Sequence, residues 1–352
     1  MAKRKFLMPI LTLKNNGGGI VAFELARSIV KRGYDVCILS SRYYGVEAVR
    51  SPENIGIKFF TAPSIFGKKI STAIFLIYSF YYSIKYKPTI IYTHIATSLI
   101  PNFSSQKAIW LAQDIEYRFY SGKLKSIFKV VFKRIASNTN LLVTSNYLGR
   151  YFRRIGGRII YEKNIGISKK IFGNLLIPAD KLREVDILII AKYGEHKRGG
   201  ESKILAKYFS DQGLKVTLIN QMSDDLLPND NLRLMGTVSH TQMLQLLLTS
   251  KIFINISRSE GFGLVPLEAL HAGCMVATTP TPSIFNNESP QLKILKGNKP
   301  FIDEAADAVR YFINLPSKAF VKKTFFEDFY LEDWAFYASE SLLRLEIICH
   351  AD

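Results

Sequence analysis

Two carboxylates flank a glycine turn in the second half of the chain, and their spacing is the strongest indication of chemistry in the sequence. Seven residues separate them in the stretch Glu260-Gly261-Phe262-Gly263-Leu264-Val265-Pro266-Leu267-Glu268. The apolar run 252–256 before it is typical of a buried strand, and a helix is predicted over 266–271. Both acids then follow the carboxyl end of a strand, where open α/β sheets bind ligands. For either acid alone, the alternative is a strand-to-helix turn in which the acid is only a charge in the first turn of the helix.

Basic residues follow an earlier predicted strand of the same half. Lys192 and Lys197 lie five positions apart after the strand predicted over 186–191, and Arg198 comes next. Cations placed at a strand end are suited to binding a diphosphate. Solvated cations in an exposed loop are the alternative interpretation.

The first half carries a glycine loop over 15–19, between a predicted strand and a predicted helix. The amides of Gly18 and Gly19 could contact phosphates there. The loop lacks the spacing of a dinucleotide fingerprint and the Lys-Ser/Thr pair of a P-loop. A tight turn without a ligand therefore remains an alternative.

Three more polar residues of the first half follow predicted strands. Asp114 and Glu116 come after the strand predicted over 107–111, and His94 after that over 89–92. Asp114 could accept a hydrogen bond or a proton from an acceptor hydroxyl, and His94 and Glu116 could contact a sugar. A helix cap for Asp114 and a structural role for His94 are equally open.

Two successive alternations of strands and helices predict an α/β protein with two doubly wound domains. The expected boundaries are 1–168 and 169–330. The first alternation has strands at 6–13, 36–39, 89–92, 107–111 and 141–144, and a helix at 20–32. The second has strands at 186–191, 214–219 and 252–256, and helices at 201–211, 241–248 and 266–271.

Composition fits an intracellular protein of two domains. The chain has 352 residues, 48% of them hydrophobic, which is enough for two cores. Its three cysteines, Cys37, Cys274 and Cys349, are far apart and lack neighbours at metal-ligand spacing. We therefore expect a reducing, cytoplasmic compartment, and neither a signal peptide nor a membrane anchor.

Positive charge is concentrated in the first half. The net charge is +18, and residues 1–170 hold 28 Lys and Arg against 7 Asp and Glu, a net of +21. Such asymmetry indicates an anionic partner. Because the sequence has no helix-turn-helix, zinc-finger, RNP or KH signature, nucleic acid is the weaker candidate and an anionic membrane surface the stronger one.

Two segments bear on membrane contact. The apolar run 74–82 is too short to span a bilayer, and a buried domain helix is at least as good an interpretation as interfacial contact. The segment 123–134 combines lysines with apolar residues that include Phe128 and Phe132, a pattern suited to a helix in a headgroup region. A surface helix packed on its own domain is the alternative.

The region 185–285 resembles the retaining GT-B glycosyltransferases of family 4, whose signature is two glutamates separated by seven residues. Besides that motif, 235–239 resembles the family's Gly-x-Val/Ile-Ser turn. The stretch 271–277 resembles the family's Ala-x-Gly-x-Pro-Val-Val, with Met275 in place of the usual proline. The resemblance implies two Rossmann-like domains facing each other across a cleft, with a helix near 331–352 crossing back to the first domain.

The resemblance also implies roles for the candidate residues. Glu268 would bind the ribose hydroxyls of a nucleotide sugar, and Glu260 the donor sugar. Lys192 and Lys197 would neutralise the diphosphate, a role that Arg198 could share. The backbone amides of Gly261, Phe262, Gly263 and Leu264 would meet the sugar or a phosphate. No metal and no other cofactor is expected, because the chain lacks an Asp-x-Asp pair.

The segment Gln113-Asp114-Ile115-Glu116 resembles an element of bacterial rhamnan-type rhamnosyltransferases, with Ile115 replacing an aromatic residue. This favours dTDP-rhamnose as the donor and a lipid-linked glycan of surface polysaccharide or O-antigen synthesis as the acceptor. The expected location is the inner face of the plasma membrane. A non-catalytic scaffold that binds nucleotide sugars and a GT-B epimerase are the competing functions.

Overall fold

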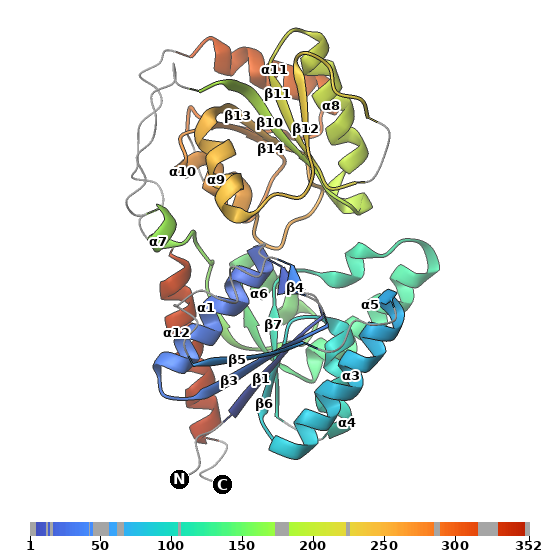
Figure 1. Cartoon of the computed structure of the whole chain (residues 1–352), viewed down its shortest axis with the longest axis vertical. Helices are drawn as coiled ribbons and strands as arrows, with labels where there is room; N and C mark the ends of the chain where they lie inside the picture. The colour runs from blue at the N-terminus through green and yellow to red at the C-terminus, as the bar shows by residue number, and fades with distance from the viewer. Residues whose placement is uncertain are drawn as a thin grey trace. The chain divides into compact units, whose positions relative to one another are not determined.

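The computed structural model describes residues 5–11, 13–14, 17–41, 43–44, 56–61, 67–104, 107–172, 183–222, 226–284, 289–315 and 330–348. The chain divides into two compact units (Figure 1). The first unit comprises Met1–Ile165 together with Leu331–Asp352, and the second comprises Gly166–Tyr330. Each unit is built on one large parallel sheet.

The sheet of the first unit has seven strands in the order β5-β3-β1-β6-β7-β8-β9. Chain order reverses between β1 and β6, which are neighbours in the sheet. Strands β1 and β3 are buried along nearly their whole length, as expected when helices cover both faces of a parallel sheet. The strands are β1 (Lys5–Ile10), β3 (Asp35–Ser40), β5 (Ile57–Thr61), β6 (Thr89–Tyr92), β7 (Ala108–Ala112), β8 (Asn140–Val143) and β9 (Arg158–Glu162). A separate short pair joins β2 (Leu13–Lys14) to β4 (Tyr43–Tyr44).

Helices cover this sheet from both sides. Figure 1 shows α1 and α12 on one side and α3 and α4 on the other. Helix α12 packs against α1, where the hydroxyls of Ser28 and Ser339 lie 2.8 Å apart and Arg32 Nε donates to Ser339 Oγ at 2.9 Å. The helices are α1 (Gly17–Lys31), α3 (Gly67–Tyr86), α4 (Leu99–Ser104), α5 (Gly122–Ser137), α6 (Asn146–Arg154) and α12 (Leu331–Ile348).

The second unit repeats this plan with six parallel strands in the order β12-β11-β10-β13-β14-β15. Chain order reverses between β10 and β13. The strands are β10 (Val185–Ala191), β11 (Val216–Asn220), β12 (Leu232–Met235), β13 (Ser250–Asn255), β14 (Met275–Thr278) and β15 (Leu292–Ile294). The helices are α7 (Lys169–Phe172), α8 (Gly199–Asp211), α9 (His240–Thr249), α10 (Leu264–His271) and α11 (Phe301–Ile313).

A buried arginine fixes the ends of two helices in this unit. The Arg183 guanidinium donates to the carbonyl of Leu247 at 3.0 Å, near the end of α9, and to that of Ala272 at 2.6 Å, directly after α10. These bonds use carbonyl groups that the ends of helices leave unpaired. They hold α9 and α10 in fixed positions beside the sheet.

Both sheets have the doubly wound order predicted from the sequence, and the predicted fold class is therefore confirmed. The glycine loop expected over 15–19 is wrong in its second part, because Gly17, Gly18 and Gly19 form the first turn of α1. Residues 15 and 16 lie outside the described residues. Glycine is unfavourable within a helix, but here Gly19 is buried, where a small residue allows close packing.

Candidate functional site

The site in the second unit is formed by two loops that follow neighbouring strands. Strand β10 ends at Ala191, and β13 ends at Asn255. The chain order of the strands reverses between β10 and β13, and doubly wound sheets bind their ligands at such a position. The two loops are also joined directly, because the backbone N–H of Arg258 donates to the carbonyl of His196 at 2.8 Å.

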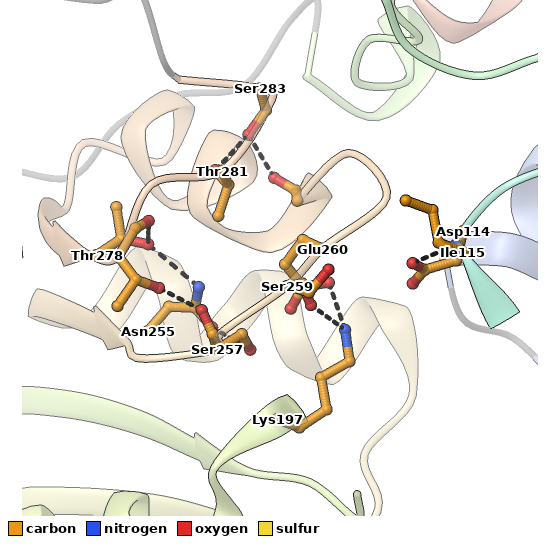
Figure 2. A network of polar contacts seen from close by, with 12 residues as sticks. Asp114, Ile115, Lys197, Asn255, Ser257, Ser259, Glu260, Thr278, Thr281 and Ser283 are labelled. Carbon is orange, nitrogen blue, oxygen red and sulfur yellow. Dashed lines mark hydrogen bonds and ion pairs between the residues drawn. The ribbon is translucent and has the colours of Figure 1, made fainter. Parts of the chain in front are cut away.

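Lys197 and Glu260 form an ion pair across these loops (Figure 2). The Lys197 Nζ lies 2.7 Å from Glu260 Oε2 and also donates to the Ser259 carbonyl at 3.2 Å. The two side chains are only 14% and 16% exposed. Burial by itself would raise the pKa of Glu260, but Lys197 and Lys192 outweigh it and hold that pKa below its usual value. Glu260 is therefore ionised near neutral pH.

Lys192 supplies a second cation beside this pair. Its side chain is half-buried, and the burial lowers its pKa, as does the charge of Lys197, while Glu260 and Glu268 act in the opposite direction. Within the described residues its Nζ makes no ion pair or hydrogen bond. A desolvated ammonium group of this kind would gain from an anionic ligand.

The loop that carries both lysines has an unusual backbone. Gly194 has a φ of 103°, and Arg198 has a φ of 51°, which non-glycine residues rarely adopt. Arg198 directly precedes α8, and its guanidinium lies over the Phe301 ring, 3.8 Å from the ring centre. The structure thus engages Arg198 with an aromatic ring of its own unit, whereas Lys192 and Lys197 both act on Glu260.

The glycine turn after β13 is held from a neighbouring loop. The backbone N–H of Ser283 donates to the Phe262 carbonyl at 2.9 Å, and the Ser283 hydroxyl donates to that of Gly263 at 2.8 Å. Gly263 has a φ of 92°, and a Cβ at this position would lie 2.8 Å from Thr281 Cβ. The position therefore requires glycine. Leu264 then begins α10, so the amides of the turn lie at a helix N-terminus.

A second network of side chains fixes the start of the Glu260 loop (Figure 2). The Asn255 amide donates to Thr278 Oγ1 at 3.1 Å and accepts from Ser257 Oγ at 3.2 Å. The Thr279 hydroxyl donates to the Ser257 carbonyl. These bonds tie the end of β13 to the end of β14, which gives the loop a rigid base.

Glu268 is buried and pairs with a histidine from another helix. His240 Nε2 lies 3.0 Å from Glu268 Oε1. The hydrogen bond to Glu268 raises the pKa of His240, and burial opposes that change. The helix predicted over 266–271 would place Glu268 in its first turn. Helix α10 begins at Leu264, so Glu268 is its fifth residue. Its carboxylate is thus held by a partner on the first turn of α9.

In the first unit, the predicted residues lie at the edge where β1, β6 and β7 end. The Gln113 side-chain amide donates to the Gly18 carbonyl at 3.1 Å, which joins the loop after β7 to the first turn of α1. Gly19 is buried in that turn. Asp114 Oδ1 accepts from the N–H of Ile115 at 2.7 Å. The structure therefore brings the glycine turn and the Asp114 loop together.

His94 and Glu116 lie side by side at the same edge. His94 Nδ1 accepts from the Ala96 N–H at 3.0 Å, which leaves the ring proton on Nε2, 3.4 Å from Glu116 Oε2. Glu116 also accepts from the Ile95 N–H at 2.8 Å. Burial raises the pKa of Glu116 to about 8, and burial lowers that of His94. The geometry thus satisfies both His94 nitrogens within the unit.

Helix α5 differs from what the basic and aromatic pattern over 123–134 suggests. Phe132 is fully buried against Trp110, with ring centres 4.9 Å apart, and Phe128 stacks on Tyr120 at 3.9 Å. Phe132 is therefore not available for membrane contact, and Phe128 is only partly exposed. Membrane contact by the rest of the helix stays a prediction. Phe132 is part of the core of this unit, and Phe128 packs against that core.

The second unit carries the part of the sequence that matches a known family. Residues 157–321 match the family described as Glycosyl transferases group 1. The chain contains a glycosyltransferase group 1 domain. None of the curated proteins matches the sequence.

Solved structures share the fold of the whole chain. Sucrose-phosphate synthase from Thermosynechococcus elongatus is 13% identical, with a TM-score of 0.69 over 99% of both chains. Alr3699/HepE from Anabaena, solved with UDP and glucose, is 15% identical, with a TM-score of 0.64 over 99% of both chains. WaaG, a glycosyltransferase involved in lipopolysaccharide biosynthesis, is 12% identical, with a TM-score of 0.65 over 95% of both chains. At these identities the likeness concerns the fold, and the two doubly wound units are those of GT-B glycosyltransferases.

The sequence alone did not indicate His240 as part of the candidate site. A signal for its position was present, because Ser239 and Gln242 form a capping box that marks residue 240 as the start of a helix. The sequence does not show that α9 packs beside α10. Across the described ranges, no cluster of three or more His, Cys, Asp or Glu is placed to hold a metal ion. The helices described there include none that is long and apolar enough to span a bilayer.

Proposed function

We propose that the protein transfers a sugar from a nucleotide diphosphate donor to an acceptor hydroxyl, and that its second unit binds the donor. The observation that carries this proposal is the cluster of Lys192, Lys197 and Glu260 where the sheet order reverses. This cluster lies inside the glycosyltransferase group 1 domain. Two ammonium groups face one ionised carboxylate, which leaves positive charge for a diphosphate.

The lysines take the diphosphate. Lys192 has no hydrogen-bond partner among the described residues and binds one phosphate directly. Lys197 sits between Glu260 and the ligand and shares its protons with both. Charge-assisted hydrogen bonds of this kind contribute about 1.5–3 kcal/mol each. Arg198 contributes to the same charge only after its guanidinium leaves the Phe301 ring.

The carboxylates take the hydroxyl groups. Glu260 accepts hydrogen bonds from the donor sugar, and Glu268, held by His240, accepts them from the ribose. The amides of Gly261, Phe262, Gly263 and Leu264 meet the sugar or a phosphate at the N-terminus of α10.

The reaction then proceeds on the donor face with retention. The bond between the anomeric carbon and the phosphate oxygen breaks, and the nucleoside diphosphate departs with the electron pair. Lys192 and Lys197 stabilise the charge that develops on it. The acceptor oxygen bonds to the same face of the anomeric carbon and gives its proton to a phosphate oxygen. Because the lysines supply the neutralising charge, we expect activity to persist when divalent ions are chelated.

The acceptor is assigned to the first unit. Asp114, Glu116 and His94 lie at the carboxyl edge of its sheet, next to Gly18 and Gly19. The net charge of +21 over residues 1–170 favours a lipid-linked glycan at an anionic membrane, on the cytoplasmic face. The likeness of 113–116 to rhamnan-type rhamnosyltransferases favours dTDP-rhamnose as the donor and surface polysaccharide or O-antigen synthesis as the process.

A thermal-shift series tests the donor assignment first. Nucleosides, nucleoside diphosphates and nucleotide sugars with uracil, thymine and guanine are compared, and the preferred diphosphate should raise the melting temperature where its nucleoside does not. A ligand at 100 times its dissociation constant adds about 2.7 kcal/mol of stability. Turnover of the preferred nucleotide sugar is then followed with and without a lipid-linked acceptor. Binding without turnover would indicate a scaffold, and an isomerised donor without an acceptor would indicate an epimerase.

A further inference from the structure

Helix α3 in the first unit has its polar and apolar residues in the reverse of the usual arrangement. Its buried stripe consists of Ser71, Phe75, Ser79 and Ser83, each four positions from the next and each 0% exposed. Ser79 Oγ donates to the Phe75 carbonyl at 2.8 Å, so this serine is satisfied within its own helix. A surface helix normally buries its apolar residues and exposes its polar ones.

The opposite face of α3 is apolar and exposed. Ile70, Ile77 and Ile84 follow one another at seven-residue intervals and are 50%, 69% and 52% exposed. Positions seven apart lie on nearly the same face of a helix, since the drift is only about 20° per heptad. Phe80 and Tyr81 lie on this face between the isoleucines and are exposed as well. We call this set, Ile70, Ile77, Phe80, Tyr81 and Ile84, the outer face of α3.

The charged residues within helix α3 are all basic. Helix α3 contains Lys68, Lys69 and Lys85 and no acidic residue. The Lys85 ammonium lies 5.5 Å from the Tyr81 ring centre, so its cationic end borders the outer face. Two copies of such a helix would bring lysines together without a carboxylate on α3 to pair with them. The charge therefore favours an anionic partner over a second copy of this chain.

We propose that the outer face of α3 lies in the headgroup region of an anionic bilayer and anchors the first unit there. Isoleucines and a phenylalanine enter the acyl boundary, tyrosine stays at the level of the headgroups, and lysines contact their phosphates. The outer face is long enough to lie in the interface, whereas no described helix can cross the membrane. This inference deepens the membrane part of the proposed function.

Helix α5 offers a smaller surface of the same chemistry. Leu124, Ile127 and Val130 are 58%, 60% and 68% exposed, and α5 also lacks acidic residues. Phe128 and Phe132 are engaged in their own unit, so α5 presents only aliphatic side chains between its lysines. The aromatic contribution to membrane binding therefore belongs to α3.

Vesicle co-sedimentation of the full-length protein tests this inference. The vesicles contain equal parts of phosphatidylglycerol and phosphatidylcholine, and no nucleotide is present. The triple variant Ile70→Ser/Ile77→Ser/Ile84→Ser should bind at least about tenfold more weakly in high salt, where the lysines are screened. A matched control is Ile204→Ser/Leu227→Ser/Ile313→Ser, which changes three equally exposed apolar residues of the second unit and should bind like the unaltered protein.

A fluorescence measurement shows whether α3 itself enters the bilayer. The two native tryptophans, Trp110 and Trp334, are buried. Tyr81→Trp should shift its emission to the blue on vesicle binding and be quenched by brominated acyl chains. Tyr337→Trp is the control, because Tyr337 is 48% exposed on α12, on the other side of the same sheet. Its emission should not change.

Three results would overturn the inference. The first is equal vesicle binding by the α3 variant and the unaltered protein. The second is Tyr81→Trp emission that brominated lipid does not quench. The third is a dimer of the unaltered protein in solution that becomes monomeric only in the α3 variant. The last would assign the outer face to a second copy of the chain. Because binding is measured without nucleotide, failure here leaves donor binding by the second unit intact. Loss of donor binding would likewise leave vesicle binding unchanged.

Discussion

The two units have the same sheet order, yet they use the edge where that order reverses in different ways. In the second unit this edge holds Lys192, Lys197 and Glu260, of which Lys197 and Glu260 form an ion pair. In the first unit it holds His94 and Glu116, whose polar atoms are satisfied by one another and by the backbone. The same fold thus has an ion pair and a further lysine at this edge in one unit. In the other unit, the polar groups His94 and Glu116 at this edge bind one another and the backbone.

We propose that this difference reflects separate roles for the two units. Positive charge in the second unit is concentrated in a loop beside two glutamates, where it can hold a diphosphate. Positive charge in the first unit is spread over helices such as α3 and α5, away from carboxylates, where it suits an extended anionic surface. The predictions below test whether charge matters at the edge of one unit and on the helices of the other.

The largest effect is expected for Lys197→Ala. Removing one partner of a buried ion pair typically costs about 3–5 kcal/mol, and the cost here is smaller because the charge of Lys192 still acts on Glu260. The variant also loses a phosphate contact, so calorimetry should show affinity for the nucleoside diphosphate falling at least about a hundredfold and affinity for the nucleoside changing little. Lys207→Ala is the control, because its pair with Asp211 on α8 is exposed. Equal losses for both ligands would show that Lys197 acts only through folding.

A smaller change is expected for Glu268→Gln. The amide keeps the shape of the side chain but replaces a charge-assisted bond to the ribose, which lowers donor affinity by roughly 1–3 kcal/mol. His240 would lose the hydrogen bond that raises its pKa. Titration by NMR should therefore show the His240 pKa falling in the variant. An unchanged donor affinity together with a shifted His240 would restrict Glu268 to a structural role.

Glu116→Gln tests the edge of the first unit through the pH dependence of stability. The folded-state pKa of Glu116, about 8, exceeds its usual value of 4.5. The protonated carboxyl group is therefore the form that the fold favours. Its contribution to the free energy of unfolding is complete below about pH 4.5 and is lost as the pH rises through 8. Glutamine resembles the protonated form at every pH. The variant should gain on the order of 1–3 kcal/mol over the unaltered protein between pH 5 and pH 9 in denaturant titrations. A constant difference between the two proteins would show that Glu116 is already ionised.

Local sequence patterns predicted much of this fold because the strands are short apolar runs that end at polar loops. The strand over 89–92 has the expected bounds, the helix expected near 331–352 begins at residue 331, and most other predicted elements differ by a few residues. Strands β5, β9, β12, β14 and β15 were not predicted, because runs of three to five residues show little periodicity. Helix α3 could be predicted only in part from the sequence. Its composition shows that the segment is apolar, but composition does not show which face of the helix is buried.

The same limit applies to the candidate site. Glycine spacing and charge indicated which loops matter, but the pairing of His240 with Glu268 depends on the packing of α9 and α10. The aromatic residues of 123–134 were misjudged for a similar reason. Phe128 and Phe132 carry no sequence signal that separates a core ring from a membrane ring. Their environment depends on the positions of Tyr120, which stacks on Phe128, and of Trp110, which contacts Phe132.

The smallest effect is expected from the charge on α5 alone. Each Lys near an anionic surface contributes on the order of 1 kcal/mol at low salt. Lys125→Gln/Lys129→Gln should therefore weaken binding to phosphatidylglycerol vesicles by roughly tenfold or somewhat more at low salt, and hardly at all at high salt. Lys203→Gln/Lys207→Gln on α8 provides the matched control in the second unit. If the α5 and α8 variants lose binding equally, the membrane responds to the net charge of the chain, and the contrast between the two units does not extend to their surfaces.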